Sequence, residues 1–410
     1  MAHQQESVEF APAKRMDKIR YAIRDILFEA KRVEDQGIAL TKLNIGDPAA
    51  VGGFKAPAHI IEAVRKAWAD HKYAYSPAAG ILEAREAVAA DYAKHGVKVD
   101  PDHVIVTAGL SEAIRFLLTA TINPGEQVLL PRPTYPLYVT MLNELGGEAS
   151  HYDLDESQDW ALDQASIEQA AGPNARMLVM ISPNNPTGRV FSKDDLQKVI
   201  DFCRKRRLLL VMDEVYNRLA YDIEGPVMSV TDLDFEGVPL ITMNGLSKNW
   251  LLPGSRVGWM VFHNTHLQKG VLDAIIRLAN ARLSGPTPHQ YAVKAALEGP
   301  QDHLIQLRKD LELRAQAVAD GIAKVPFASV VKPAAAFYAM PRLDLSHPSL
   351  GGRYSSDTQV VVEWLRRTGV VTVPGSGFGQ ALGTHHFRVV TLAPPEVLRE
   401  AMASLAVLAS

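Results

Sequence analysis

Between residues 103 and 262, short apolar runs alternate with longer amphipathic stretches, and this alternation constrains the fold more than any other feature of the sequence. Two of the runs, residues 176–181 and 208–212, are almost entirely apolar, which is typical of strands buried on both faces of a sheet. Similar runs lie at residues 103–107, 127–130, 238–242 and 257–262. Strands that alternate with helices predict a mostly parallel sheet flanked by helices, an α/β fold.

Beyond about residue 283 the pattern changes. A helical pattern covers residues 288–323. Shorter strand-like runs follow at residues 337–340, 370–373 and 387–392. An amphipathic stretch over residues 17–35 carries apolar residues at helical spacing. A chain of 410 residues can bury two cores. We expect an N-terminal arm and helix that joins the small domain (1–49), a large domain (50–287) and a small C-terminal α+β domain (288–410).

Composition argues against several classes of function. The net charge is −3 and charges of both signs are interspersed, so no basic surface for nucleic acid or anionic lipid is expected. Residues 1–9 lack the apolar core of a signal peptide, and the apolar runs are too short to span a bilayer. Cys203 is the only cysteine, which fits a reducing compartment, and His385-His386 lacks further metal ligands at a suitable spacing. We expect a cytoplasmic globular protein without a metal.

Residues 247–256, with the sequence Ser-Lys-Asn-Trp-Leu-Leu-Pro-Gly-Ser-Arg, combine three groups that suit an anionic aldehyde cofactor. A deprotonated Lys248 amine can form a Schiff base with the aldehyde, while Ser247 and Arg256 can hold a phosphate. Burial and a neighbouring cation such as Arg256 would lower the pKa of the lysine. Because most single lysines are solvated surface charges, this interpretation depends on partners elsewhere in the chain.

Asp213 follows the apolar run 208–212, and ligands of such sheets bind outside the carboxyl ends of the strands. A carboxylate beside a pyridine nitrogen keeps that nitrogen protonated, so the ring can withdraw electrons. Tyr216 lies three residues further on and can bring a phenol to the same site. The alternatives are a turn or helix-capping aspartate and a packed aromatic side chain.

Two turns at the ends of predicted strands carry further candidates. The string Pro-Asn-Asn-Pro-Thr-Gly at residues 183–188 forces a fixed turn, in which Asn185 presents its amide to a ligand or stabilises its own backbone. At residues 107–111, Thr-Ala-Gly-Leu-Ser joins a strand to a helix, whose N-terminus favours phosphate binding. Gly109 allows close backbone approach there, and Ser111 either binds the phosphate or caps the helix.

Arg388 lies in a strand-like run at residues 386–390. A guanidinium matches a carboxylate with two parallel hydrogen bonds, which a lysine cannot form. Arg388 is therefore a candidate for binding a substrate carboxylate, and the alternative is a solvated arginine on an edge strand.

Together these residues resemble the class I and II aminotransferases, which are pyridoxal-phosphate enzymes of fold type I. The resemblance covers residues 17–405 and rests on residues 44–48 (Asn-Ile-Gly-Asp-Pro), Tyr75 with Gly80, residues 183–188, Asp213 with Tyr216, Ser247-Lys248, residues 253–259 and Arg388. It implies pyridoxal 5′-phosphate as cofactor and a homodimer with shared active sites. It also implies a mostly parallel seven-stranded sheet in the large domain.

The resemblance implies a role for each matching residue. Lys248 would bind the aldehyde of the cofactor and carry the proton, and Asp213 would pair with the pyridine nitrogen. Tyr216 and Asn185 would contact the ring oxygen, and Asn185 would also reach the substrate. Tyr135 would stack on the ring.

Further roles concern the phosphate and the substrate. Gly46 and Arg388 would contact the α-carboxylate of the substrate. The phosphate would be held by Gly109, Leu110, Ser111, Ser247, Arg256 and, in the neighbouring subunit, Tyr75.

Within this family, the sequence most resembles bacterial alanine (glutamate–pyruvate) aminotransferases, on Tyr-Ala-Ile-Arg at residues 21–24 and on the strings at residues 43–48, 155–160 and 244–248. In that subgroup Tyr21 would wall the substrate pocket, and the alternative is an aromatic that packs its helix. Residues 249–252 and 280–288 depart from the pattern, which bears on the choice of substrate.

The implied activity is ping-pong transfer of an amino group between L-alanine or L-glutamate and 2-oxo acids such as pyruvate and 2-oxoglutarate. An aromatic or broad-range aminotransferase and a carbon–sulfur β-lyase would use the same cofactor residues, because all of them stabilise a carbanion. The alternative from another class is a ligand-sensing module like those fused to transcription regulators. That module would need a basic DNA-binding segment, which residues 1–17 do not provide.

Overall fold

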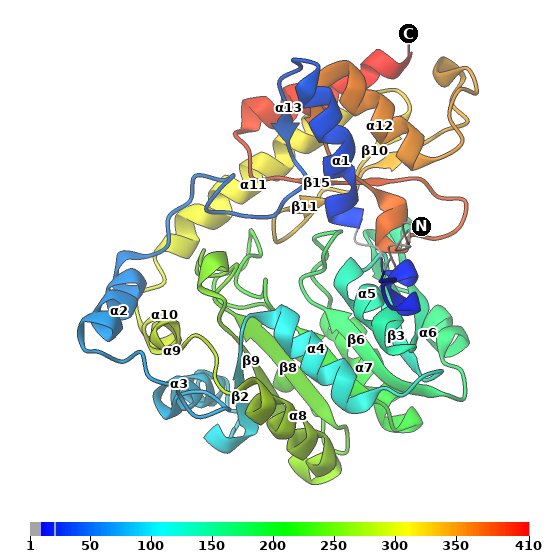
Figure 1. Ribbon diagram of the computed structural model, residues 1–410. Coiled ribbons are helices and arrows are strands. Elements are labelled where there is room, and N and C mark those ends of the chain that lie inside the picture. The colour runs from blue at the N-terminus through cyan, green and yellow to red at the C-terminus, as the bar shows by residue number, and fades with distance from the viewer. Residues whose placement is uncertain (1–9, 20–21, 410) are drawn as a thin grey trace, which may run out of the picture.

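The computed structural model describes residues 10–19 and 22–409, which form a large domain and a small domain, one above the other in Figure 1. The centre of the large domain is a sheet with the strand order β2-β9-β8-β7-β6-β3-β4-β5. Its strands are β2 (Val104–Thr107), β3 (Gln127–Arg132), β4 (Glu148–Asp155), β5 (Ala161–Leu162), β6 (Ala175–Ile181), β7 (Leu209–Asp213), β8 (Leu240–Gly245) and β9 (Gly258–His263). β5 and β9 run antiparallel to their neighbours, and the other pairs are parallel.

The predicted fold class is confirmed, and the sheet has one strand more than the expected seven. The added strand, β5, has two residues and pairs with the end of β4, so it is too short to leave a pattern in the sequence. β4 was not among the predicted runs, because it lies near the edge of the sheet and mixes polar and apolar residues. The other strands correspond to the apolar runs.

Both faces of the sheet are buried, which explains why its central strands are continuously apolar. Along β6, Met177, Val179 and Ile181 belong to one core, whereas Leu178 and Met180 belong to another. Helices α4 (Leu110–Thr121), α5 (Pro136–Leu145) and α8 (Lys269–Arg282) cover the first face. Helices α6 (Gln164–Ala170) and α7 (Lys193–Arg206) cover the second.

A further group of helices packs at the β2 edge of the sheet: α2 (Ala58–Ala69), α3 (Leu82–Ala93), α9 (Thr287–Gln290) and α10 (Ala292–Glu298). Ala296 of α10 shares a core with Ile60, Val88 and Val104. Because α10 lies beyond residue 287 and still packs on the large domain, we propose that this domain extends to the linker before the next helix. The division of the chain at residues 49 and 287 is otherwise still a prediction.

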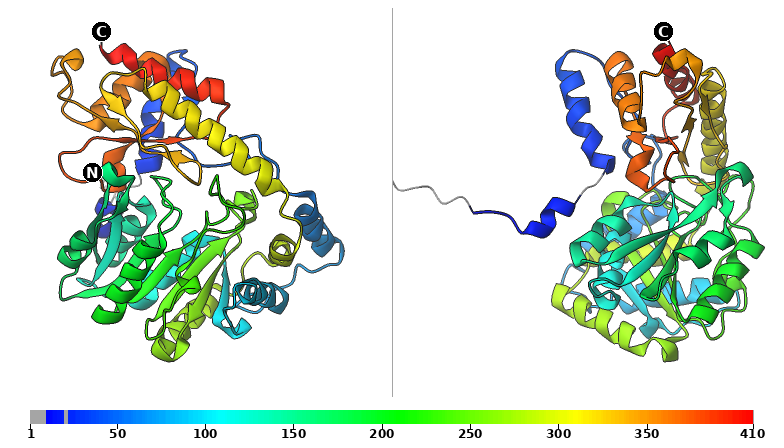
Figure 2. Two further views of the ribbon diagram at one scale, coloured as in Figure 1. Left: turned by 180° about the vertical axis from the view of Figure 1, so that it is seen from behind. Right: turned by 90° about the vertical axis from the view of Figure 1, so that its right-hand side faces the viewer.

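The small domain contains α11 (His303–Ile322), α12 (Asp357–Thr368) and α13 (Pro395–Ser404). Helix α1 (Ala22–Asp35) packs with them, since Ile26, Ala30 and Val33 share a core with Trp364. Figure 2 shows α1 standing beside α12, although the two are far apart in sequence. The short strands are β1 (Thr41–Lys42) with β13 (Val370–Val371), β10 (Ala328–Ser329) with β12 (Arg342–Leu343), and β11 (Tyr338–Ala339), β15 (Phe387–Val390) and β14 (Val373–Pro374) in one sheet.

The small domain faces the edge of the large sheet at which β6, β7 and β8 end, because residues from both lie around one cavity. Among the described residues, no helix is long and apolar enough to cross a membrane.

Candidate active site

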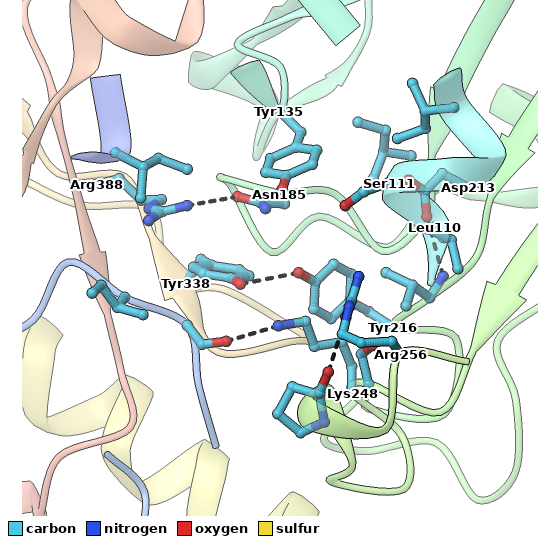
Figure 3. A pocket seen from close by; sticks show the side chains of 18 of the residues that line it. Leu110, Ser111, Tyr135, Asn185, Asp213, Tyr216, Lys248, Arg256, Tyr338 and Arg388 are labelled. Carbon is cyan, nitrogen blue, oxygen red and sulfur yellow. Dashed lines mark hydrogen bonds between the residues drawn. The ribbon is translucent and has the colours of Figure 1, made fainter. Parts of the chain in front are cut away.

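A cavity of about 210 Å³ lies between the carboxyl ends of the large-domain strands and the small domain. Figure 3 shows that side chains from both domains point into it. Its lining contains most of the residues selected from the sequence: Gly46, Leu110, Ser111, Tyr135, Asn185, Asp213, Tyr216, Ser247, Lys248, Arg256 and Arg388. The cavity therefore unites residues that are more than 300 positions apart in the chain.

Lys248 follows the end of β8, and its Nζ donates a hydrogen bond of 2.7 Å to the backbone oxygen of Gly46. Burial lowers the pKa of this amine from 10.5 to about 8, because a charged ammonium is poorly solvated there. Asp47 opposes this effect, while the cations Arg388 and Arg256 add to it. Lys248 is thus a partly buried lysine whose neutral, nucleophilic form is accessible near neutral pH.

Asp213 is the last residue of β7 and is almost completely buried. One carboxylate oxygen accepts a hydrogen bond of 3.2 Å from the Tyr138 hydroxyl, and the other accepts one of 3.3 Å from the Val215 amide. Burial raises the pKa of Asp213 to about 6, and these two hydrogen bonds oppose the rise. A buried carboxylate of this kind suits a cationic ring nitrogen as its partner.

The N-terminus of α4 and Arg256 meet on one side of the cavity. The first amides of a helix have no partner within the helix, so they can bind an anion. Gly109, which precedes α4, has a φ of 74°, and a Cβ there would lie only 2.3 Å from Nη2 of Arg256. Arg256 donates hydrogen bonds to the backbone oxygens of Pro253 (2.9 Å) and Ala108 (3.3 Å). Because Gly109 has no side chain, the guanidinium of Arg256 can lie across the N-terminus of α4.

Arg388 lies on β15 and is 2% exposed, which excludes the alternative of a solvated edge-strand arginine. Its Nη2 donates to the backbone oxygen of Asn44 at 2.7 Å, and its Nη1 lies 3.4 Å from Oδ1 of Asn185. The guanidinium carbon is 4.8 Å from the ring centroids of both Tyr338 and Phe378. Arg388 is thus a fixed cation at the cavity, suited to a carboxylate.

Tyr216 and Tyr135 place two aromatic rings at the cavity. The Tyr216 hydroxyl lies 3.0 Å from that of Tyr338. Burial raises the pKa of Tyr216 well above 10, so the side chain is a neutral phenol. Tyr135 immediately precedes α5.

Two of the predicted residues lie outside the lining of the cavity, and a third is not among the described residues. Gly109 is behind Arg256 and outside the lining of the cavity. Tyr75 is 83% exposed and is also outside the lining. Tyr21 lies outside the described residues.

Sequence reasoning missed several residues of the site. Tyr338, Arg24 and Ile23 line the cavity, and Tyr138 holds Asp213 from beneath. Tyr338 could have been found only from the pairing of β11 with β15, and one sequence does not reveal strand pairing. Trp250 belongs to the segment 249–252 that departs from the family pattern. It does not line the cavity but packs in the core at the β2 edge of the sheet.

The sequence matches the family model described as aminotransferase class I and II over residues 38–405, so the chain belongs to this family. It is 34% identical over 403 residues to the glutamate–pyruvate aminotransferase AlaA of Haemophilus influenzae, covering 97% of each chain. It is also 35% identical over 398 residues to the alanine aminotransferase of Mycobacterium tuberculosis, covering 95% of this chain and 90% of that protein.

Solved structures give the same assignment. The alanine aminotransferase from Pyrococcus furiosus superposes with a TM-score of 0.91 at 35% identity, covering 97% of this chain and 99% of that one. An aspartate aminotransferase from Thermus thermophilus superposes with a TM-score of 0.85 at 28% identity, covering 98% and 100%. The protein is a transaminase, and its cofactor is pyridoxal 5′-phosphate.

The cavity fits this cofactor by its own chemistry. A helix N-terminus with an arginine across it suits a phosphate, a buried carboxylate suits a pyridinium nitrogen, and a partly buried lysine of lowered pKa suits an aldehyde. These three features come from different strands of one sheet edge.

Proposed function

We propose that the protein transfers an amino group between L-alanine or L-glutamate and the 2-oxo acids pyruvate and 2-oxoglutarate by a ping-pong mechanism. The relatives named above as alanine or glutamate–pyruvate aminotransferases support this choice. The single structural observation that carries the proposal is that the partly buried Lys248 lines one cavity together with the buried residues Asp213 and Arg388.

Lys248 is the residue that would hold the aldehyde of the cofactor and would move a proton at the substrate. When bound, pyridoxal phosphate supplies an aldehyde that takes up an amino group and a ring that withdraws electrons from the substrate α-carbon. The Nζ of Lys248 would take up the α-proton of the substrate and return it, and a pKa of about 8 suits proton exchange near neutral pH. Asp213 would keep a proton on the ring nitrogen.

The remaining cofactor contacts divide by chemistry. Tyr135 would cover the ring, and Tyr216 and Asn185 would donate hydrogen bonds to its oxygen. Hydroxyls, backbone amides and a guanidinium would hold the phosphate, from Gly109, Leu110, Ser111, Ser247 and Arg256.

The substrate is held on the small-domain side of the cavity. Arg388 binds the α-carboxylate in a bidentate pair, and Asn185 and the backbone of Gly46 complete that contact. The role of Tyr21 as a wall of the substrate pocket stays a prediction.

The assembly we propose is a homodimer in which Tyr75 reaches the phosphate bound by the partner subunit. Two observations support it: Tyr75 is 83% exposed, and Trp68 and Tyr73 lie nearby, each about half exposed, with ring centroids 5.9 Å apart. Aromatic side chains gathered at a surface are typical of an interface between proteins. A cytoplasmic location also stays a prediction.

The test is an absorption titration of the cofactor-loaded protein, first with L-alanine and then with 2-oxoglutarate. The proposal predicts that alanine converts the pyridoxal form to the pyridoxamine form and that the oxo acid reverses the change. Loss of the cofactor band only with aromatic amino acids would favour the aromatic aminotransferase. Release of pyruvate and ammonia from cystathionine without an oxo acid would favour the β-lyase.

A further inference from the structure

Tyr338 occupies the space between the substrate-facing and cofactor-facing residues of the cavity. It lies on β11, which pairs with β15 so that Tyr338 is opposite Val390, and its side chain is 3% exposed. Figure 3 shows its ring beside Arg388 and its hydroxyl directed at Tyr216. The roles proposed above give Tyr338 no function, although it touches one residue from each side of the site.

The ring of Tyr338 contacts the cation that we assign to the substrate. The guanidinium carbon of Arg388 lies 4.8 Å from the ring centroid, which is the range of a cation–π contact. Phe378 contacts the same guanidinium at the same distance, so two rings restrict its position. Since Arg388 is buried, its direction depends on these contacts as well as on Asn44 and Asn185.

The hydroxyl of Tyr338 contacts the phenol that we assign to the cofactor. The two hydroxyl oxygens are 3.0 Å apart, and either can be the donor in this pair. Gly46 leaves room for the Tyr338 hydroxyl, because a Cβ at Gly46 would lie only 2.3 Å from it. When Tyr216 directs its own proton to the ring oxygen of the cofactor, Tyr338 must donate to Tyr216. A phenol that accepts such a bond becomes a stronger donor itself.

We propose that Tyr338 is a positioning residue with two separable functions. Its ring holds Arg388 in place for the substrate carboxylate, and its hydroxyl strengthens the hydrogen bond from Tyr216 to the ring oxygen of the cofactor. The inference rests on the proposed roles of Arg388 and Tyr216.

The substitution Tyr338→Phe separates the two functions, because it removes the hydroxyl and keeps the ring. The measurement is the pH at which the absorption of the cofactor-loaded protein changes, as the nitrogen joining Lys248 to the cofactor loses its proton. A weaker bond from Tyr216 leaves more negative charge on the ring oxygen, which holds that proton more tightly. The midpoint is therefore expected to rise by about 0.5–1 pH unit, the size of one net hydrogen bond.

The same variant gives a second measurement, the affinity for propionate. Propionate is a carboxylate without an amino group, so it does not react, and its binding is measured from the change it causes in the absorption spectrum. Because Y338F keeps the ring, this affinity is expected to stay at the wild-type value. Phe378→Leu is the matched control, since it removes the other ring on Arg388 and no hydroxyl near Tyr216. It is expected to weaken propionate binding about 3- to 10-fold and to leave the pH midpoint in place.

A further variant tests whether the hydroxyl acts through Tyr216. In a Tyr216→Phe background, adding Y338F should produce no further change in the midpoint, because the intermediate group is gone. A midpoint unchanged by Y338F alone, an equal shift in F378L, or an undiminished second shift in the double variant would each overturn the proposal. A wild-type protein that shows the pH-dependent band but ignores alanine would refute the proposed substrate and leave these tests intact.

Discussion

The cofactor-facing and substrate-facing sides of the cavity are built in different ways. On the first side, Asp213 is the last residue of β7 and Lys248 lies three residues after the end of β8, and these two strands are parallel neighbours in one sheet. On the second side, Arg388 depends on Asn44, Tyr338 and Phe378, which come from distant parts of the chain. This difference shows that the local sequence is enough to place reactive groups at the edge of a sheet. The position of a substrate-binding arginine depends instead on packing between segments that are distant in the sequence.

On the cofactor side, the substitution with the largest expected effect is Lys248→Ala. It removes the group that binds the cofactor and moves the proton, so turnover should fall on the order of 10⁴-fold or more. Steady-state transamination of alanine measures this loss, and Lys269→Ala on the surface is the control. Near-normal turnover by K248A would refute the assignment of the lysine.

On the substrate side, Arg388→Lys keeps the positive charge and removes the planar pair of donors. We expect KM for alanine to rise about 30- to 100-fold, since charged hydrogen bonds of about 2–3 kcal/mol are lost. Initial rates over a range of alanine concentrations test this, with Arg277→Lys, an exposed position, as the control. An unchanged KM would place the carboxylate elsewhere in the cavity.

The pH dependence of cofactor uptake examines the cofactor side without substrate. Burial lowers the pKa of Lys248, so its neutral amine predominates above about pH 8. The rate at which the cofactor-free protein binds pyridoxal phosphate should rise about tenfold per pH unit below that value and level off above it. A rate that keeps rising toward pH 10.5, as for a solvated lysine, would contradict the burial account.

A smaller effect is expected from Gly109→Ala at the helix N-terminus. The new Cβ would meet Arg256 at 2.3 Å, and the φ of 74° is unfavourable for alanine. Cofactor affinity should weaken about tenfold, as expected for backbone strain of 1–3 kcal/mol. The matched control is Gly254→Ala, whose Cβ would have no neighbour within 4 Å. Equal affinities of the two variants would show that Arg256 does not depend on Gly109.

The difference between the two sides of the cavity also explains which parts of the fold and the site could be predicted from the sequence. Asp213 directly follows an apolar run, and Asn185 lies in the turn after another, so their positions were enough to place both at one sheet edge. Lys248 was selected by its chemistry together with the nearby Ser247 and Arg256. The class of fold followed from the same apolar runs. The two-residue strand β5 and the mixed strand β4 did not, because neither carries an apolar period.

The substrate side was harder to predict for a physical reason. Arg388 was selected by its chemistry. Its burial against the ring of Tyr338 depends on the pairing of β11 with β15, which are about 50 residues apart in the sequence. Tyr338 and Tyr138 were missed because an aromatic in an apolar segment is usually a core residue. Only their contacts with Tyr216 and Asp213 distinguish them.

The most direct test of the division is the affinity of the R388K variant for pyridoxal phosphate, measured by absorption during titration of the cofactor-free protein. If the two sides are separately built, this dissociation constant should stay within about threefold of the wild-type value, although KM for alanine rises. A loss of cofactor affinity as large as the rise in KM would contradict the account, because the arginine would then belong to both sides.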